Sequence, residues 1–479
     1  MRNPSPLQAK GHFWLPSNPE EKLAGELHIS QFGQVKLDLL GVFSNPEWQG
    51  SGDVEEMFGH LRKVDCICGN VHGEGFVTLL NCLSTRINAN LFSSQALEAS
   101  SFDATIALIG DCYGKNELAF STLNFTMEGL DDWLNTDTIK PTLKIKTEGD
   151  ILRSFFGGSV DFGFKESATF ALNDDIDIQF ISPVKLSPIF PNRPLDYLSL
   201  RSQPYISVKS QIPRQIEYFI DLSDKIRKFI SLAVDQEVQM QSFTFMKEHS
   251  GQAVPVRMYL ETGASRKAQY EPEILKVLFT LSDIENDFAK MMRHWIERFE
   301  PRKVGHALNL YFAGKWKETS FLDVNFIFLA QAIEVLHRQT FPSSKPMDKK
   351  EYRKIADEFI DSFSETIPDL IKNNIYQANR VSLRDRVEEM AMPFENWFRD
   401  NESSKDFAVK VSETRNHLTH YSRELVNEQG MGEPLHNLYT KLEILLLLHI
   451  LEFIGFSREQ ITTVTERSKR LTEGLDTSS

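Results

Sequence analysis

Arg415 and His420, near the C-terminus, have the side-chain types that RNA cleavage without a metal requires. Attack by a ribose 2′-hydroxyl on its own phosphodiester needs a group that moves protons near neutral pH, and a histidine does so. It also needs a fixed cation beside the charge that develops on the phosphate, and an arginine guanidinium supplies one. Arg415 and His420 are therefore suited to act as a pair in such a reaction.

Both residues fall in the segment Phe407–Tyr421, whose apolar spacing predicts a helix. At about 100° per residue, the expected core-facing stripe consists of Phe407, Val411, Thr414, Leu418 and Tyr421. Arg415 lies at about 80° from Phe407, whereas Asn416 and His420 lie at about 180° and 220°. We therefore expect Asn416 and His420 to be at least partly accessible, with Asn416 supporting the pair, and Val411 and Leu418 to be buried.

The spacing of the pair is weak evidence by itself. A histidine follows an arginine by four to six residues twice in the chain, at Arg302 with His306 and at Arg415 with His420. Composition alone predicts about two such matches. Only Arg415 is followed by a small polar residue, Asn416, whereas a lysine follows Arg302. The alternative is a solvated Arg/His face on an ordinary helix.

The elements that must position the pair change in character along the chain. Through about residue 260, apolar and polar residues alternate in short runs such as Val35–Leu39 and Val254–Leu260, which is typical of antiparallel strands. From about Tyr270 onwards, apolar residues recur three and four apart. A capping box at Ser282–Glu285 predicts a helix to about Glu300. Further helices are predicted at about 320–341, 348–365, 382–398, 404–422 and 434–455.

The pattern predicts an α+β multidomain protein. We expect a β-rich N-terminal domain at 1–269, sandwich-like or barrel-like, and an all-α helical bundle at 270–465, followed by a C-terminal tail at 466–479. The sequence leaves the choice between sandwich and barrel open.

Charge limits where nucleic acid could bind. The 479 residues carry a net charge of −14, and residues 1–200 hold 15 Lys/Arg against 26 Asp/Glu. Residues 201–479 hold 38 Lys/Arg against 41 Asp/Glu. Because proteins that grip long nucleic acid usually present a basic face, we expect any RNA contact to be local and in the second half.

Cysteine usage and apolar runs favour a cytoplasmic protein. The apolar stretch within Leu442–Gly455 is interrupted by charged residues and is too short for a membrane span, so it predicts a buried helix. The chain opens without the apolar run of a secretory signal. We interpret the four cysteines, Cys66, Cys68, Cys82 and Cys112, as reduced, buried and structural.

The helical half resembles the HEPN domain of ApeA-type anti-phage proteins. The matching stretches are Phe328–Arg338, Ser382–Val387, Thr414–His420 and the helix around Leu438–Gly455. The N-terminal part resembles the β-rich domain of the same family through Gly11–Pro16 and Ala24–Leu27. The resemblance covers most of the chain.

This resemblance implies a HEPN ribonuclease used in abortive-infection defence, with Arg415 and His420 as its catalytic pair. It implies a homodimer that joins two such pairs across a two-fold axis. It further implies an RNA substrate, with tRNA as one candidate, and a phage-derived trigger sensed by the β-rich domain. No cofactor is expected, and no metal is expected because no His/Cys/Asp/Glu cluster at metal-ligand spacing lies near Arg415. Glu334 and Arg338 would brace the Arg415 helix, although an ordinary ion pair at i, i+4 is the alternative for these two residues.

Two readings of function therefore stand. The first is a metal-independent endoribonuclease. The second is a non-catalytic HEPN module for dimerisation or RNA binding, joined to a β domain that binds a ligand. His417 lies near the edge of the apolar stripe and is interpreted as a packing or dimer contact, and the role of His337 is left open.

Overall fold

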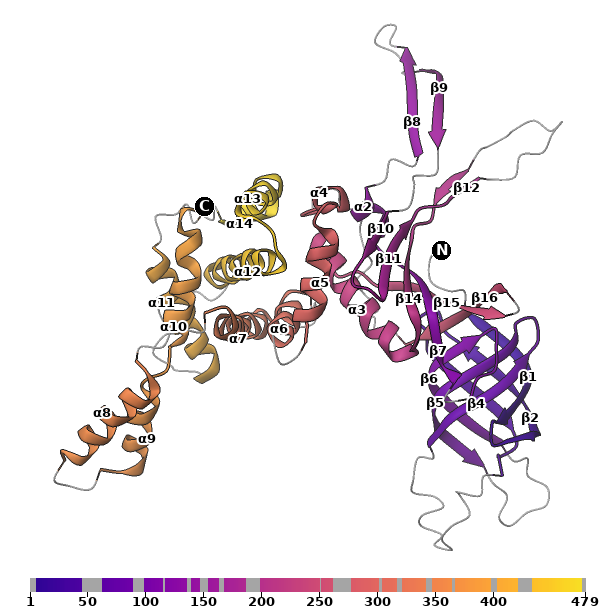
Figure 1. Ribbon diagram of the computed structural model, residues 1–479, viewed down its shortest axis with the longest axis horizontal. Coiled ribbons are helices and arrows are strands. Elements are labelled where there is room, and N and C mark those ends of the chain that lie inside the picture. The colour runs from indigo at the N-terminus through magenta and orange to yellow at the C-terminus, as the bar shows by residue number, and fades with distance from the viewer. Residues whose placement is uncertain are drawn as a thin grey trace, which may run out of the picture. The chain divides into compact units, whose positions relative to one another are not determined.

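A computed structural model describes residues 6–44, 63–88, 99–114, 117–135, 139–146, 154–162, 168–186, 199–249, 251–261, 277–300, 304–316, 321–341, 347–363, 367–397, 403–420 and 433–475. The chain divides into two compact units, residues 1–289 and 290–479. The first is rich in strands and the second is helical (Figure 1), so the predicted α+β fold class is confirmed.

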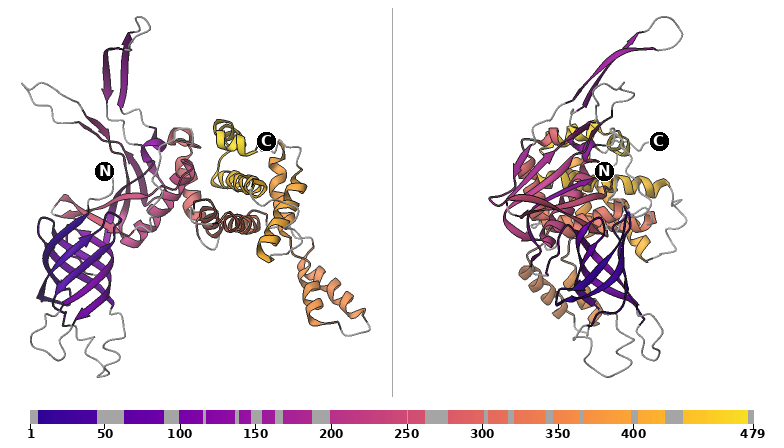
Figure 2. Two further views of the ribbon diagram at one scale, coloured as in Figure 1. Left: turned by 180° about the vertical axis from the view of Figure 1, so that it is seen from behind. Right: turned by 90° about the vertical axis from the view of Figure 1, so that its right-hand side faces the viewer.

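Six strands of the first unit close into a barrel. In order around it they are β6 (Ala99–Ile109), β3 (Val35–Leu40), β2 (Asn18–Ile29), β1 (Leu7–Leu15), β4 (Lys63–Val71) and β5 (Gly75–Asn88), and β5 pairs back to β6. Figure 2 shows the strands of opposite walls crossing one another. Alternate residues of β3, namely Val35, Leu37 and Leu39, are at most 3% exposed and join an apolar interior. The open choice between sandwich and barrel is thereby settled for these strands.

The same sheet continues beyond the barrel. From β6 it passes in order through β16 (Gln252–Leu260), β15 (Met240–His249), β7 (Ala119–Met127), β14 (Tyr205–Gln215), β11 (Ile176–Ile181) and β10 (Thr169–Ala171). Two separate hairpins pair β8 (Ile139–Lys146) with β9 (Ser154–Phe162) and β12 (Val184–Leu186) with β13 (Leu200–Ser202).

An 18-residue helix that the alternation did not predict covers part of this sheet. It is α3 (Ile216–Ala233), which packs on β7, β14 and the short α2 (Leu130–Leu134). Fully buried Trp133 of α2 lies 6.3 Å from Phe229 of α3, measured between ring centroids. The buried residues of α3 recur at helical spacing, so the signal was present within a region interpreted as strands.

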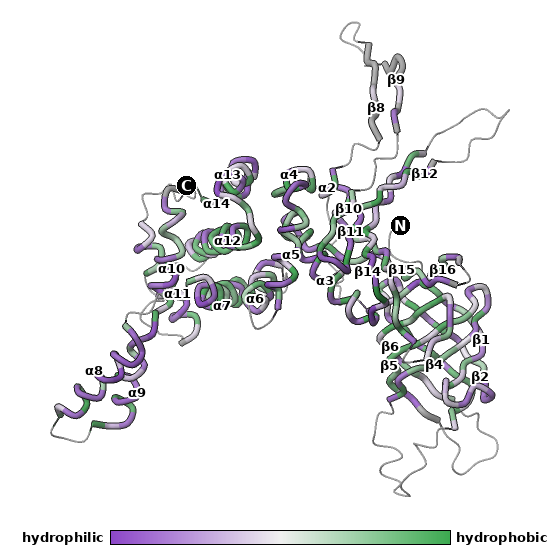
Figure 3. Tube along the Cα trace, viewed as in Figure 1, coloured by the Kyte–Doolittle hydropathy of each residue, from purple (hydrophilic) through white to green (hydrophobic). Residues whose placement is uncertain are grey.

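The second unit is a bundle around one apolar helix. Its elements are α5 (Phe288–Arg298), which begins just before the boundary, α6 (Gly305–Trp316), α7 (Leu322–Thr340), α8 (Lys349–Asp361), α9 (Asp369–Gln377), α10 (Leu383–Ala391), the 3-10 helix η4 (Met392–Trp397), α11 (Ser404–His420), α12 (Glu433–Ile454), α13 (Arg458–Arg467) and α14 (Lys469–Leu475). Residues 441–451 of α12 are all buried, and Figure 3 shows the apolar character of this helix. α7 packs against α6, α10, α11 and α12.

The helix predictions hold best where the apolar period is long. α7, α8, α10 with η4, α11 and α12 occupy the predicted segments to within a few residues. The predicted helix over 282–300 is instead α4 (Leu281–Ile284) followed by α5. Its capping box is formed by Thr280 and Asp283, not by Ser282 and Glu285, because the backbone N–H of Thr280 donates to the Asp283 carboxylate at 2.6 Å.

Helix α14 occupies residues that the sequence assigned to a tail. Glu443 of α12, 3% exposed, lies 2.7 Å from the Lys315 ammonium and 2.5 Å from the Arg470 guanidinium of α14. Burial acts to raise the pKa of Glu443, but the charges of Arg470 and Lys315 outweigh it and lower the pKa below its ordinary value. This buried carboxylate holds α14 against α12, so the expectation of a tail from 466 is wrong for residues 469–475.

The cysteine prediction is wrong for one pair. Cys68 on β4 and Cys112, just after β6, form a disulfide, while Cys66 and Cys82 are free and buried. The segment after β6 folds back over β4, as shown by the Cys66 thiol, whose Sγ lies 3.4 Å from the Tyr113 carbonyl oxygen. Strand periodicity gives no sign of this return.

Among the helices described, none is long and apolar enough to cross a membrane.

Candidate active site

Helix α11 carries the predicted pair at its C-terminal end. Phe407 and Val411 are at most 1% exposed and Asn416 is exposed, as the helical wheel predicted. Leu418, two residues from the end of the helix, is half-buried rather than buried. His420 is the last residue of α11, and its side chain lies outside the described part of the structure.

The guanidinium of Arg415 is held between two oxygen acceptors. Its Nη2 donates to Oε1 of Glu334 on α7 at 2.9 Å, and its Nη1 donates to Oδ1 of the adjacent Asn416 at 3.2 Å. The Arg415 side chain is 31% exposed and that of Glu334 is 25% exposed. An ion pair of this exposure contributes on the order of 1 kcal/mol or less to stability. The contact therefore orients the guanidinium more than it stabilises the fold.

Glu334 receives a second arginine from its own helix. Nη2 of Arg338 lies 3.4 Å from the other carboxylate oxygen of Glu334, with the Arg338 side chain 60% exposed. One carboxylate thus accepts from two guanidinium groups, one on α7 and one on α11. This arrangement places both arginines on the same accessible side of the bundle.

A buried histidine lies one turn further along α7. His337 is 0% exposed, and its Nδ1 lies 2.9 Å from Nη1 of Arg386 on α10. Its Nε2 lies 2.8 Å from the Glu389 carboxylate. Because a guanidinium only donates, Nδ1 must accept, and the ring proton sits on Nε2 and is donated to Glu389. Burial lowers the pKa of His337, against the opposing effect of the Glu389 hydrogen bond.

The structure brings some of the predicted residues together and separates others. Arg415, Asn416, Glu334 and Arg338 form one cluster, whereas His337 points into the α7–α10 interface and His417 is buried at 7% exposed. In the chance pair, His306 is exposed on α6, and Arg302 lies outside the described residues.

Sequence reasoning gave no role to Arg386 and Glu389. Arg386 was part of a stretch that matched the family, yet its contact with His337 joins residues 49 positions apart. No local pattern on one helix encodes such a contact. Only the packing of α10 against α7 reveals it.

The cluster around Arg415 is suited to binding an anion. A guanidinium has five N–H donors, and the contacts with Glu334 and Asn416 use two of them. The remaining donors suit the non-bridging oxygens of a phosphate. Within the ranges the structure describes, no three His, Cys, Asp or Glu side chains gather as a metal site would require.

Comparison with protein families gives two matches that together span most of the chain. Residues 8–295 match the ApeA N-terminal domain 1, and residues 327–460 match the Apea-like HEPN domain. The second match contains the whole Arg415 cluster. No curated protein and no solved structure matches the chain significantly.

Proposed function

Since this chain belongs to the ApeA family of anti-phage proteins, whose C-terminal part is a HEPN domain of the nuclease type, we propose that it is a metal-independent endoribonuclease of abortive infection. The observation that carries the proposal is the Arg415 guanidinium, half-exposed and oriented by Glu334 and Asn416. Because these contacts already orient the guanidinium, less side-chain entropy is lost when it binds a phosphate.

In the proposed reaction, Arg415 binds the non-bridging oxygens of the scissile phosphate. His420 takes the proton of the ribose 2′-hydroxyl or returns one to the leaving 5′-oxygen. The attacking 2′-oxygen forms a bond to phosphorus while the bond to the 5′-oxygen breaks. The products are a 2′,3′-cyclic phosphate and a 5′-hydroxyl, with Arg415 balancing the added charge in the transition state.

We further propose that the site is completed by a second copy of the chain. One arginine and one histidine at the end of a single helix form a sparse site, and a two-fold axis near α11 would bring two pairs into one groove.

The substrate is RNA, with tRNA as one candidate. The β-rich unit would act as a sensor or brake, because the excess of acidic residues in 1–200 would repel RNA until a phage-derived trigger binds.

The test compares variants of α11 and α7 in the full-length protein. Arg415→Ala should lower the rate of RNA cleavage by about 10²- to 10³-fold, as expected for loss of a cation that stabilises developing charge. Glu334→Gln should lower it by about tenfold, because the guanidinium remains but loses its charged partner. Lys405→Ala, which removes an exposed cation at the start of α11, is the matched control and should not change the rate.

Light scattering on each variant separates catalysis from assembly. A dimer that persists in Arg415→Ala while cleavage is lost supports the nuclease. Unchanged cleavage in both Arg415→Ala and His420→Ala would contradict it and favour the alternative of a non-catalytic HEPN module with a ligand-binding β domain.

A further inference from the structure

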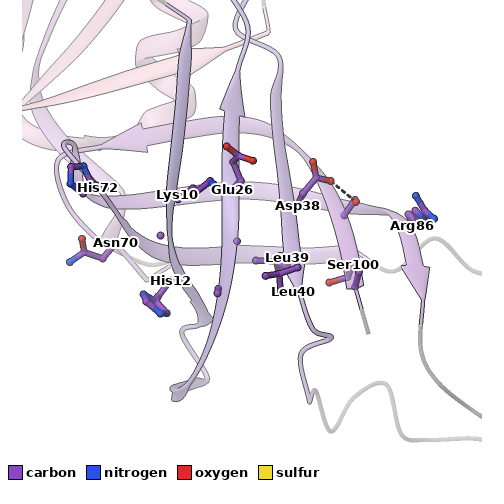
Figure 4. A pocket seen from close by; sticks show the side chains of 15 residues that line it. Lys10, His12, Glu26, Asp38, Leu39, Leu40, Asn70, His72, Arg86 and Ser100 are labelled. Carbon is purple, nitrogen blue, oxygen red and sulfur yellow. Dashed lines mark hydrogen bonds between the residues drawn. The ribbon is translucent and has the colours of Figure 1, made fainter. Parts of the chain in front are cut away.

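A groove with a volume of about 890 Å³ crosses the outside of the β-barrel (Figure 4). Most of its lining residues alternate with buried residues along their strands and so face away from the core, as Lys10 and His12 do between the buried Ala9 and Phe13. A closed barrel of tilted strands has a hyperboloid surface. Such a surface is concave along its axis, which leaves room for a ligand.

Strand register arranges the outward side chains of the groove into two rows. The first row crosses neighbouring strands from β5 to β1 through Arg86, Ser101, Asp38, Glu26 and Lys10. The second row crosses from β3 to β4 through Leu40, Ala24, His12 and Asn70. His72 adjoins the end of the first row, because its backbone N–H donates to the Lys10 carbonyl at 2.9 Å.

Two glycines lie between the rows where the strand backbones approach closely. A Cβ at Gly25 would lie 2.6 Å from the Asp38 carbonyl oxygen, and one at Gly11 would collide with the Asn70 carbonyl. Only glycine fits such positions. The close approach of the backbones beneath the groove therefore depends on Gly11 and Gly25.

The carboxylates of the groove already have partners. Glu26 accepts from the Gln8 amide at 3.0 Å, and Asp38 accepts from the Ser101 hydroxyl at 2.6 Å. Asp38 also lies 3.1 Å from the Lys36 ammonium. These contacts hold two acids on neighbouring strands, which would otherwise repel each other.

The cationic and hydrogen-bond-donating side chains of the groove, unlike its carboxylates, have no such partners. Among the described residues, no side-chain hydrogen bond or ion pair is formed by five exposed residues of the groove, namely Lys10, His12, Asn70, His72 and Arg86. Four of them gather where β1 meets β4: His12 is directly opposite Asn70, and His72 adjoins Lys10. Because residues 1–200 are strongly acidic overall, a cluster of unpaired donors here points to an anionic ligand.

We propose that the groove binds a nucleotide. Its phosphate is held where β1 meets β4, by Lys10, His12, Asn70 and His72. The sugar hydroxyls or base amino groups donate to Glu26 and Asp38, which lie one and two strands away, or about 5 and 10 Å. The base packs on Leu40 and Ala24. The volume lies within the usual range for small-molecule sites, about 300–1,000 Å³.

The phosphate part of the proposal is tested by calorimetry on the full-length protein with AMP, GMP, CMP and UMP as probes. At least one should bind with one site per chain, and its nucleoside, which lacks the phosphate, should bind at least about tenfold more weakly. The double variant Lys10→Ala/His72→Ala should weaken the nucleotide at least about tenfold, because two phosphate contacts are lost. Lys63→Ala, an exposed lysine on β4 outside the groove, is the matched control and should leave the affinity unchanged.

Two further variants separate this site from others. Glu26→Gln should weaken the nucleotide but leave the binding of inorganic phosphate unchanged, since only the sugar or base contacts Glu26. Arg415→Ala should leave nucleotide affinity unchanged, so that failure of the nuclease proposal and failure of this one are distinguishable. Three results would overturn the proposal: no binding of any of the four probes at millimolar concentration, binding that survives the double variant, or binding lost in Arg415→Ala.

Discussion

Nη1 of Arg386 lies 2.9 Å from Nδ1 of the fully buried His337. The guanidinium cannot accept a hydrogen bond, so this contact fixes the neutral tautomer of the imidazole with its proton on Nε2. His337 is three residues from Glu334, which orients Arg415. The Arg386–His337 contact therefore fixes α7 against α10 one turn from the point where Glu334 of α7 contacts Arg415 of α11.

Removing Arg386 should destabilise the helical unit. In Arg386→Ala the Nδ1 acceptor of His337 loses its donor inside the bundle, and an unsatisfied buried polar group costs about 1–3 kcal/mol of unfolding free energy. Denaturant unfolding of the full-length protein, followed in the helical signal, measures the loss. Arg384→Ala, a half-buried arginine on the same helix, serves as the control, and an equal loss in both variants would contradict the role given to Arg386.

Stability should fall as the pH drops below about 6.5. The folded-state pKa of His337 is lowered, so the unfolded chain binds the proton more readily than the folded one. The stabilisation is fully present above the unfolded pKa of about 6.5 and is lost as pH falls through that value toward the folded pKa. Buried His449 has a lowered pKa for the same reason and adds to the effect.

The pH prediction is checked by unfolding free energies measured between pH 8 and pH 5. His337→Gln should flatten the slope, because the amide does not titrate, and the remaining slope should reflect His449. A wild-type curve that does not change over this range would rule out neutral buried histidines in the folded state.

Glu443→Gln should be among the more destabilising single changes in the helical unit. The carboxylate is 3% exposed and faces the Lys315 ammonium and the Arg470 guanidinium, so the variant removes the buried negative charge that both cations contact. Loss of one partner from a buried ion pair costs about 3–5 kcal/mol. Thermal unfolding measures the loss, with Glu473→Gln, a change at an exposed position, as the control. A fall in the midpoint temperature no larger than that of the control would mean that water screens the charges around Glu443.

How far the sequence predicted this structure depends on how local the signal is. The pattern of α11 predicted buried Phe407 and Val411 and exposed Asn416, because helical period alone decides which side faces the core. The i, i+4 spacing predicted a pair between Glu334 and Arg338. The family resemblance implied that these two residues brace the helix of Arg415. The 2.9 Å contact between Glu334 and Arg415 needed the packing of α7 on α11.

Features that join distant parts of the chain were beyond the sequence pattern. Cys68 meets Cys112 only because the segment after β6 returns over β4, and His337 meets Arg386 across 49 residues. Lys10 and His12 are two residues apart on β1, so the period of a strand puts them on one face. Their position beside Asn70 and His72 required the register of β1 against β4.

The proposed mechanism makes a chemical prediction about metal and product. Because Arg415 and His420 would supply the charge and the proton transfer, cleavage should continue in excess EDTA. End-group analysis should find a 2′,3′-cyclic phosphate and a 5′-hydroxyl. A substrate with 2′-deoxyribose at the cut site should bind with nearly the same affinity and remain intact, because its phosphate contacts persist while the nucleophile is gone.

The control for this prediction is Arg415→Ala under the same conditions, which shows that the cleavage measured belongs to the protein and not to a contaminating ribonuclease. The rate should also fall on the acid side of about pH 6.5 if His420 acts as the base in the limiting step, since the protonated ring cannot accept the 2′-hydroxyl proton. Cleavage that stops in EDTA and returns with Mg²⁺, or cutting at the deoxy-substituted position, would contradict attack by the 2′-hydroxyl. Either result would leave the Arg415 cluster as an anion-binding surface, because its contacts with Glu334 and Asn416 orient the guanidinium whether or not a bond is broken beside it.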